Sequence, residues 1–211
     1  LYSLLLNAYL GTAQQNMIRN PDFEEYFDCD YDVLEDPLET VILYWEALRS
    51  TPRYFNTHCQ DLDALPLNGR GNITLVSMSS NTSDSSGLDK RNYAQTLFTK
   101  RMVPHKPYYL EYYIRTRPVE GARSISHHGV LFMDSLKNDL TINPPWYPYI
   151  TTPHIWSDTL VSTTYDWTRM NYCFTPDSAF GALAIGVFHP ANEVIKGPGG
   201  NFRLRFHDYD A

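Results

Sequence analysis

Apolar and polar residues alternate most clearly over residues 108–116, which predicts a β-strand with one buried and one amphipathic face. A turn-rich segment, residues 103–107, separates it from a strand predicted over residues 93–102, so we expect the two to pair as an antiparallel hairpin. Further strands are predicted over residues 73–78, 129–133, 167–174, 182–188 and 202–208. Apolar and charged residues alternate in the last of these, which favours an outer or edge strand.

Long irregular segments without helical periodicity separate these strands. They include a Ser/Asn/Asp-rich segment, residues 77–87, and a Pro/aromatic segment, residues 143–153. Short strands with such connections favour a two-sheet antiparallel β-sandwich of the jelly-roll kind. The composition agrees, because 16 Tyr and 10 Phe suit sheet surfaces while 14 Pro and 11 Gly supply breaks. We therefore predict an all-β chain with one sandwich domain over residues 14–211.

Residues 1–13 form an apolar run that ends in small residues, with Gly11 and Ala13 at the two positions that signal peptidase reads. The run resembles the end of a secretory signal peptide and is too short to span a bilayer as a helix. It indicates an exported protein without a membrane span. The alternative is a first strand or a helix packed on the sandwich.

The net charge of -7 argues against nucleic acid as a partner, because phosphate binding needs clustered Lys and Arg. One small basic cluster, Lys100, Arg101 and Lys106, is more typical of a solvated face, and we assign it no function here.

Several motifs occur in an order that is typical of one family. The first two are residues 20–26 (Asn-Pro-Asp-Phe-Glu-Glu-Tyr) and residues 51–56 (Thr-Pro-Arg-Tyr-Phe-Asn), with Trp45 between them. Later matches are residues 92–97, 108–113, 129–135, 166–168 and 184–188. The chain resembles the jelly-roll, galactose-binding-like module of exported Bacteroidota proteins, which often precedes an OmpA-like domain or a secretion signal. The resemblance implies a secreted or outer-membrane surface location.

The resemblance also implies a disulfide and a metal site. Cysteines often follow the two opening motifs in relatives, so Cys29 and Cys59 are expected to pair, whereas Cys173 lies in a strand-like run typical of an inert buried cysteine. Related jelly rolls hold a structural calcium between the first and last strands, which would fall to Glu25 and Asp208. Solvated acidic residues at a sheet edge are the alternative for this pair.

Three triplets of Asp, a hydroxyl residue and an apolar residue resemble the O-glycosylation acceptor of exported Bacteroidota proteins. Their acceptor residues are Ser135, Thr159 and Ser178.

The best sequence candidate for a binding surface is the Pro/aromatic segment together with the tryptophan that follows it. Exposed aromatic rings stack on sugars or contact proteins, and prolines hold such rings in place at low entropic cost. The proposed ligand-binding residues are Trp146, Tyr147, Tyr149 and Trp156. The alternative is a loop whose rings are buried over the end of the sandwich.

No motif indicates catalysis. The sequence contains no Gly-x-Ser-x-Gly and no marked pair of carboxylates, and adjacent His127 and His128 would face opposite sides of a strand. We therefore expect a non-enzyme, namely an exported cell-surface module that binds glycan or a surface protein within a larger envelope assembly. The alternative is a structural subunit of a surface layer, filament or secretion-linked complex. A carbohydrate-active enzyme is the remote alternative.

Overall fold

The computed structural model of the chain describes residues 16–30, 36–49, 52–59, 67–76, 92–116, 126–137, 152–161, 166–188 and 201–206, the last range as backbone. The predicted leader, residues 1–13, therefore lies outside the described residues. No helix in the described ranges has the length and hydrophobicity needed to cross a membrane.

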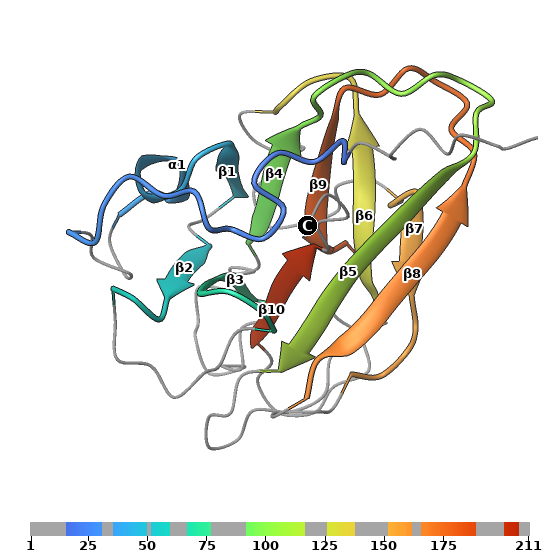
Figure 1. Ribbon diagram of the computed structural model, residues 1–211. Coiled ribbons are helices and arrows are strands. Elements are labelled where there is room, and N and C mark those ends of the chain that lie inside the picture. The colour runs from blue at the N-terminus through green and yellow to red at the C-terminus, as the bar shows by residue number, and fades with distance from the viewer. Residues whose placement is uncertain are drawn as a thin grey trace, which may run out of the picture.

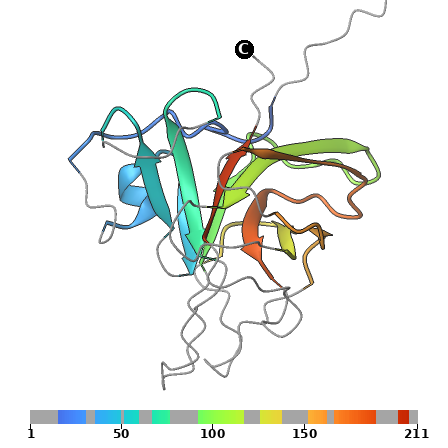
Figure 2. The ribbon, with the colours of Figure 1, turned by 90° about the horizontal axis from the view of Figure 1, so that it is seen from below.

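The described residues form two five-stranded antiparallel sheets (Figure 1). The β6 sheet has the order β1-β4-β9-β6-β7, and the β5 sheet has the order β2-β3-β10-β5-β8. The elements are α1 (Leu38–Val41), β1 (Trp45–Arg49), β2 (Arg53–Asn56), β3 (Gly71–Val76), β4 (Tyr93–Leu97), β5 (Tyr108–Thr116), β6 (His128–Met133), β7 (Ile155–Ser157), β8 (Thr168–Phe174), β9 (Ala182–Val187) and β10 (Asn201–Phe206). The short helix α1 lies beside β1 and β2 (Figures 1 and 2).

Consecutive strands alternate between the two sheets, except in the pairs β2–β3 and β6–β7. This alternation is the jelly-roll arrangement, so the predicted fold class is confirmed. The bounds of β5 are the predicted ones, and β3, β6, β8, β9 and β10 begin and end within two residues of their predicted limits.

The predicted hairpin of β4 and β5 is wrong. β4 pairs with β1 and β9, whereas β5 lies in the other sheet between β10 and β8. The segment between them crosses from one sheet to the other, because Phe98 and Met102 turn into the core and hold this connection over the end of the sandwich.

The prediction of an edge position for β10 is also wrong. β10 pairs with β3 on one side and with β5 on the other, so it is the central strand of its sheet. Charged residues can alternate in a central strand when one face of the sheet is polar, and the β5 sheet has such a face, as described below.

The main core fills the space between the sheets. Alternate residues of β5, including Tyr112 and Ile114, face Val130 and Phe132 of β6 and Ile185 of β9 in one cluster of buried side chains. Burial of such residues supplies most of the folding free energy, at about 25 cal/mol for each Å² of apolar surface removed from water.

A second buried cluster lies on the outer face of the β6 sheet and contains Tyr93, Leu131, Met133 and Phe188. Because both faces of this sheet are covered, β6 and β9 are buried at every position and read as continuous apolar runs.

The two opening motifs pack against each other. Asn20 accepts a hydrogen bond from the backbone N–H of Glu25 (2.9 Å), and its backbone carbonyl accepts one from the buried Trp45 indole (3.0 Å). Tyr54, from the second motif, donates to the carbonyl of Phe23 (2.9 Å). The residues that suggested a family in the sequence are therefore a structural unit that ties the N-terminal segment to β1 and β2.

Cys29 and Cys59 form a disulfide, with their Cα atoms 5.0 Å apart, so the predicted pairing is confirmed. Cys173 is a free cysteine and is exposed, which contradicts the expectation of a buried residue. The reason is the face of β8 on which Cys173 lies. β8 is an edge strand, and Cys173 faces outward beside its cross-strand partner Tyr109.

Candidate functional site on the outer face of the β5 sheet

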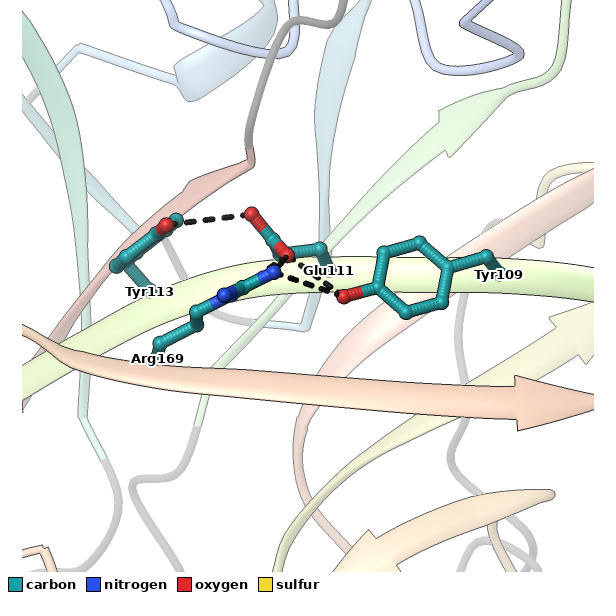
Figure 3. Close-up of polar contacts among 4 residues, drawn as sticks. All are labelled: Tyr109, Glu111, Tyr113 and Arg169. Carbon is teal, nitrogen blue, oxygen red and sulfur yellow. Dashed lines mark hydrogen bonds and ion pairs between the residues drawn. The ribbon is translucent and has the colours of Figure 1, made fainter. Parts of the chain in front are cut away.

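Four polar and aromatic side chains form one hydrogen-bonded cluster on the outer face of the β5 sheet (Figure 3). Tyr109, Glu111 and Tyr113 are alternate residues of β5, so they share a face, and Arg169 of β8 is registered opposite Tyr113. The inner face of the same stretch carries Leu110 and other core residues. The alternation that buries one side of β5 therefore assembles this cluster on the other side.

The Glu111 carboxylate is the centre of the cluster. It accepts hydrogen bonds from the Tyr109 hydroxyl (2.7 Å), the Tyr113 hydroxyl (3.2 Å) and the Arg169 Nε (2.7 Å). Arg169 also donates from Nη2 to the Tyr109 hydroxyl (3.1 Å). Only 2% of the Glu111 side chain is exposed, whereas 54% of the Arg169 side chain is exposed. The buried carboxylate thus fixes three side chains, of which Tyr109 and Arg169 are exposed and Tyr113 is partly exposed.

The ionisation of the cluster follows from these contacts. Hydrogen bonding to Glu111 and to Tyr109 raises the pKa of the Arg169 guanidinium above its ordinary range. Desolvation, followed by the negative charge of Glu111, raises the pKa of the Tyr113 hydroxyl. At neutral pH the cluster therefore presents a fixed cation at Arg169 and a protonated hydroxyl at Tyr113.

The same face continues beyond the cluster. Asn171 of β8 is exposed opposite Glu111, and the Arg115 guanidinium of β5 stacks over the ring of Trp167 with its Cζ 4.8 Å from the ring centroid. The register sets β10 residues Arg203 opposite Arg115 and Arg205 opposite Tyr113. The exposed groups of this face in the described residues, Tyr109, Arg169 and Asn171, are suited to binding a hydroxyl-rich or anionic ligand.

The predicted aromatic site is only partly within the described residues. Trp146, Tyr147 and Tyr149 lie outside them. Trp156 belongs to β7, an edge strand of the β6 sheet, where 44% of it is exposed. Its ring stacks on His127 with centroids 5.6 Å apart and an interplanar angle of 9°. Trp156 therefore stands in the other sheet from the Glu111 cluster.

The remaining predicted sites have the following positions. Ser135, Thr159 and Ser178 are all exposed, and their glycosylation stays a prediction. The Glu25 side chain is exposed, whereas Asp208 lies outside the described residues, so the calcium site also stays a prediction. The carboxylate of the neighbouring Glu24 already accepts a hydrogen bond from the Gly71 backbone N–H (2.7 Å). Within the described ranges, no group of three or more potential metal ligands comes together.

The adjacent His127 and His128 face opposite ways, as the sequence predicted. His128 is fully buried, with its ring edge-on to Tyr112 at 6.0 Å between centroids, and among the described residues neither of its ring nitrogens has a hydrogen-bond partner. Desolvation, with a smaller contribution from His127, lowers the pKa of His128 from 6.5 to about 4.

This buried imidazole predicts acid instability. The unfolded chain takes up a proton on His128 near pH 6.5, but the folded chain does so only near pH 4. The full stability is therefore present above pH 6.5, and about 2–3 kcal/mol is lost as the pH falls through this window. Urea unfolding between pH 4 and pH 7 should show this loss in the native protein and a much smaller loss in His128→Phe. Equal losses in both proteins, or an equal effect of His58→Ala at an exposed histidine, would contradict the assignment.

Sequence reasoning identified the amphipathic face of β5 but did not identify it as a site. The alternation over residues 108–116 indicates that Glu111 shares a face with two tyrosines, which was the available signal. The partner Arg169 is 58 residues away, and only strand pairing brings it to Glu111.

No model of a known protein family matches this chain, and no curated protein sequence matches it. Among solved structures, the chain is similar to the C-terminal family 22 carbohydrate-binding module of Clostridium thermocellum Xyn10B, with 12% identity and a TM-score of 0.40 over 88% of this chain and 94% of that one. It is also similar to the K1 cleaved adhesin domain of Lys-gingipain from Porphyromonas gingivalis, with 11% identity and a TM-score of 0.41 over 83% and 93% of the two chains.

A third similar structure is a CBM22-1–GH10 fragment of the Clostridium thermocellum xylanase in complex with xylohexaose, with 12% identity and a TM-score of 0.41. That match covers 84% of this chain and spans 28% of the xylanase chain. Likenesses at this level establish neither a family nor a ligand for this protein.

Proposed function

We propose that this chain is an exported, non-catalytic module that binds glycan through the outer face of the β5 sheet. The observation that carries the proposal is the cluster of Tyr109, Glu111, Tyr113 and Arg169, in which a buried carboxylate fixes exposed aromatic and guanidinium groups. The disulfide supports export, because such bridges persist in oxidising compartments. Membership of a larger envelope assembly is part of the same proposal.

The chemistry of the cluster suits sugar recognition. Tyr109 is 38% exposed, so its ring offers a surface on which a sugar ring can stack. Arg169 still has guanidinium N–H groups for the hydroxyl oxygens of a ligand, since the group carries five donors in a fixed fork. Because Glu111 holds both residues in place before binding, little side-chain entropy is lost when the ligand arrives.

The same contacts favour binding over catalysis. Each oxygen of the Glu111 carboxylate already accepts hydrogen bonds within the cluster, and Arg169 stays charged. A glycosidase needs a second carboxyl group at a defined separation across the bond that is cleaved. The cluster instead consists of one carboxylate, one guanidinium and two phenols, which are groups that bind and orient.

A glycan array followed by calorimetry tests this function. Tyr109→Ala and Arg169→Ala should each weaken binding to the best array ligand by about 1–3 kcal/mol, as expected for exposed anchors at the centre of a site. The Trp156→Ala variant is the matched control, because it removes an exposed aromatic ring from the other sheet.

The three variants separate the two candidate surfaces. If Trp156→Ala alone loses binding, the ligand binds at the aromatic site predicted from the sequence, and the outer face of the β5 sheet is not the site. If no glycan binds the native protein at any concentration tested, the proposed function is wrong.

The structural-subunit alternative is favoured by one observation. β8 is a seven-residue strand at the edge of the β5 sheet, and a long edge strand can pair with a strand of another chain. Concentration-dependent assembly in sedimentation experiments, abolished by a proline at a β8 residue whose backbone N–H points away from β5, would favour this alternative over glycan binding.

A further inference from the structure

A cavity of about 720 Å³ opens at the end of the sandwich where the connection from β4 to β5 crosses between the sheets. Its walls come from both sheets and from the N-terminal segment, which is fastened there by a bridge between Ile18 and Phe98 and by a hydrogen bond from the Thr99 N–H to the Met17 carbonyl (2.8 Å). The cavity volume lies within the range of roughly 300–1,000 Å³ that is typical of small-molecule sites.

The floor of this cavity is apolar. Leu110 of β5 and Leu183 of β9 come from opposite sheets, and between them Phe132 and Phe174 stack with ring centroids 4.5 Å apart. Met102, from the crossing connection, completes the floor. An apolar molecule or chain that enters the cavity therefore meets side chains that belong to the main core or pack against it, where its burial is favourable.

The mouth of the cavity is cationic. Lys100, Arg101 and Lys106 all line it, and none of the lining residues within the described ranges is Asp or Glu. Arg101 is fastened to the wall, because its Nε donates to the Ala179 carbonyl (3.0 Å) and its guanidinium pairs with Asp134. Lys100 and Lys106 are exposed and form no ion pair with the described residues.

This arrangement is unexpected for the chain as a whole. The protein carries a net charge of -7, yet three of its 17 basic residues surround one apolar opening. Lysine ammonium groups attract anions, and the attraction strengthens where low-dielectric walls displace water. A ligand that fits this cavity should therefore combine an apolar body, which contacts the floor, with a negative charge, which lies at the mouth.

We propose that this cavity binds a small amphipathic anion, of the class of medium-chain carboxylates, with its chain on the aromatic floor and its carboxylate between Lys100 and Lys106. The site differs from the proposed glycan site. It lies at the end of the sandwich and shares only Tyr109 with the cluster on the sheet face.

Calorimetric titration of the intact protein with decanoate tests this site, with decyltrimethylammonium as the cation of matched chain length. We expect saturable one-to-one binding of decanoate that weakens as salt is added, and at least about tenfold weaker binding of the cation. Replacing both lysines, in Lys100→Ala with Lys106→Ala, should weaken decanoate binding by about 5- to 30-fold, the effect of two ion pairs. Arg70→Ala, which removes an exposed cation outside the cavity, should leave decanoate binding unchanged.

The Met102→Trp variant tests the floor, because the larger ring should occupy part of it and weaken the binding of decanoate. If this variant does not fold, the double lysine variant still tests the site. Both lysines are exposed, so replacing them should leave the melting temperature unchanged. The proposal is overturned if both amphiphiles bind equally well, if the double lysine variant binds decanoate as the native protein does, or if decanoate shows no saturable binding.

Discussion

Replacing Gly71 with alanine is expected to lower the free energy of unfolding by about 4 kcal/mol. Gly71 is the first residue of β3, where it pairs with Asn56. A β-carbon at this position would overlap the backbone carbonyl of Phe23, which is fully buried. Because the overlapping atoms belong to the backbone, no change of side-chain rotamer relieves the clash.

The surrounding hydrogen bonds make the clash more costly. The Phe23 carbonyl accepts the Tyr54 hydroxyl, and Glu24 accepts the backbone N–H of Gly71, so a shift of residues 23–24 away from β3 would break both contacts. Such a shift would also move the Phe23 ring away from Trp45, whose centroid lies 5.0 Å from it. Overpacking and the loss of buried hydrogen bonds therefore add together.

Equilibrium unfolding in urea measures this effect. Arg70→Ala is the matched control, because it changes the preceding, exposed residue and keeps the backbone N–H that Glu24 binds, so it should stay within about 0.5 kcal/mol of the native protein. A loss of less than about 1 kcal/mol in Gly71→Ala would show that the segment at residues 23–24 moves freely, contrary to the packing described here.

Reduction of the disulfide between Cys29 and Cys59 is expected to cost about 3 kcal/mol of stability. The bridge joins residues separated by 30 positions, and closing a loop of this length restricts the unfolded chain more than the folded one. The folded chain already holds the two ends together, since the motifs before each cysteine are joined by the Tyr54 hydrogen bond.

Unfolding of the double variant Cys29→Ser with Cys59→Ser, compared with the oxidised native protein, measures this contribution. Cys173→Ser serves as the control, because this exposed thiol lies outside the bridge and its loss should change stability by less than about 0.5 kcal/mol. If the double variant is as stable as the native protein, the bridge has no role in stability.

Local sequence pattern predicted β5 and five other strands to within two residues, because a strand with one buried face imposes a period of two on its own residues, but it missed β1, β2 and β7 and extended β4 by five residues. Residues 108–116 show this, since their alternation corresponds to the bounds of β5 and to its buried face. The pattern could not give the partner of each strand. Adjacent strands often pair, but a jelly roll sends most consecutive strands to opposite sheets, so the predicted hairpin of β4 and β5 does not form.

The charged alternation in β10 misled the prediction for a related reason. A polar face on a strand indicates only that one side is not part of the apolar core. It does not distinguish an edge strand from a strand inside a sheet, and β10 lies at the centre of its sheet. Cys173 reflects the same difficulty, because its exposure depends on which face of β8 turns outward.

The pattern of the sequence was therefore enough to predict the fold class and six strand positions, and the family resemblance implied the pairing of Cys29 with Cys59. Only the tertiary structure decided which strands are neighbours, and hence that Glu111 meets Arg169 and that three cations surround one apolar cavity. The physical reason is that the periodicity of a strand depends only on which of its own faces is buried. A site, in contrast, is assembled by contacts between segments that are distant in the chain. Those contacts are selected by the packing of the whole sandwich rather than by any local pattern.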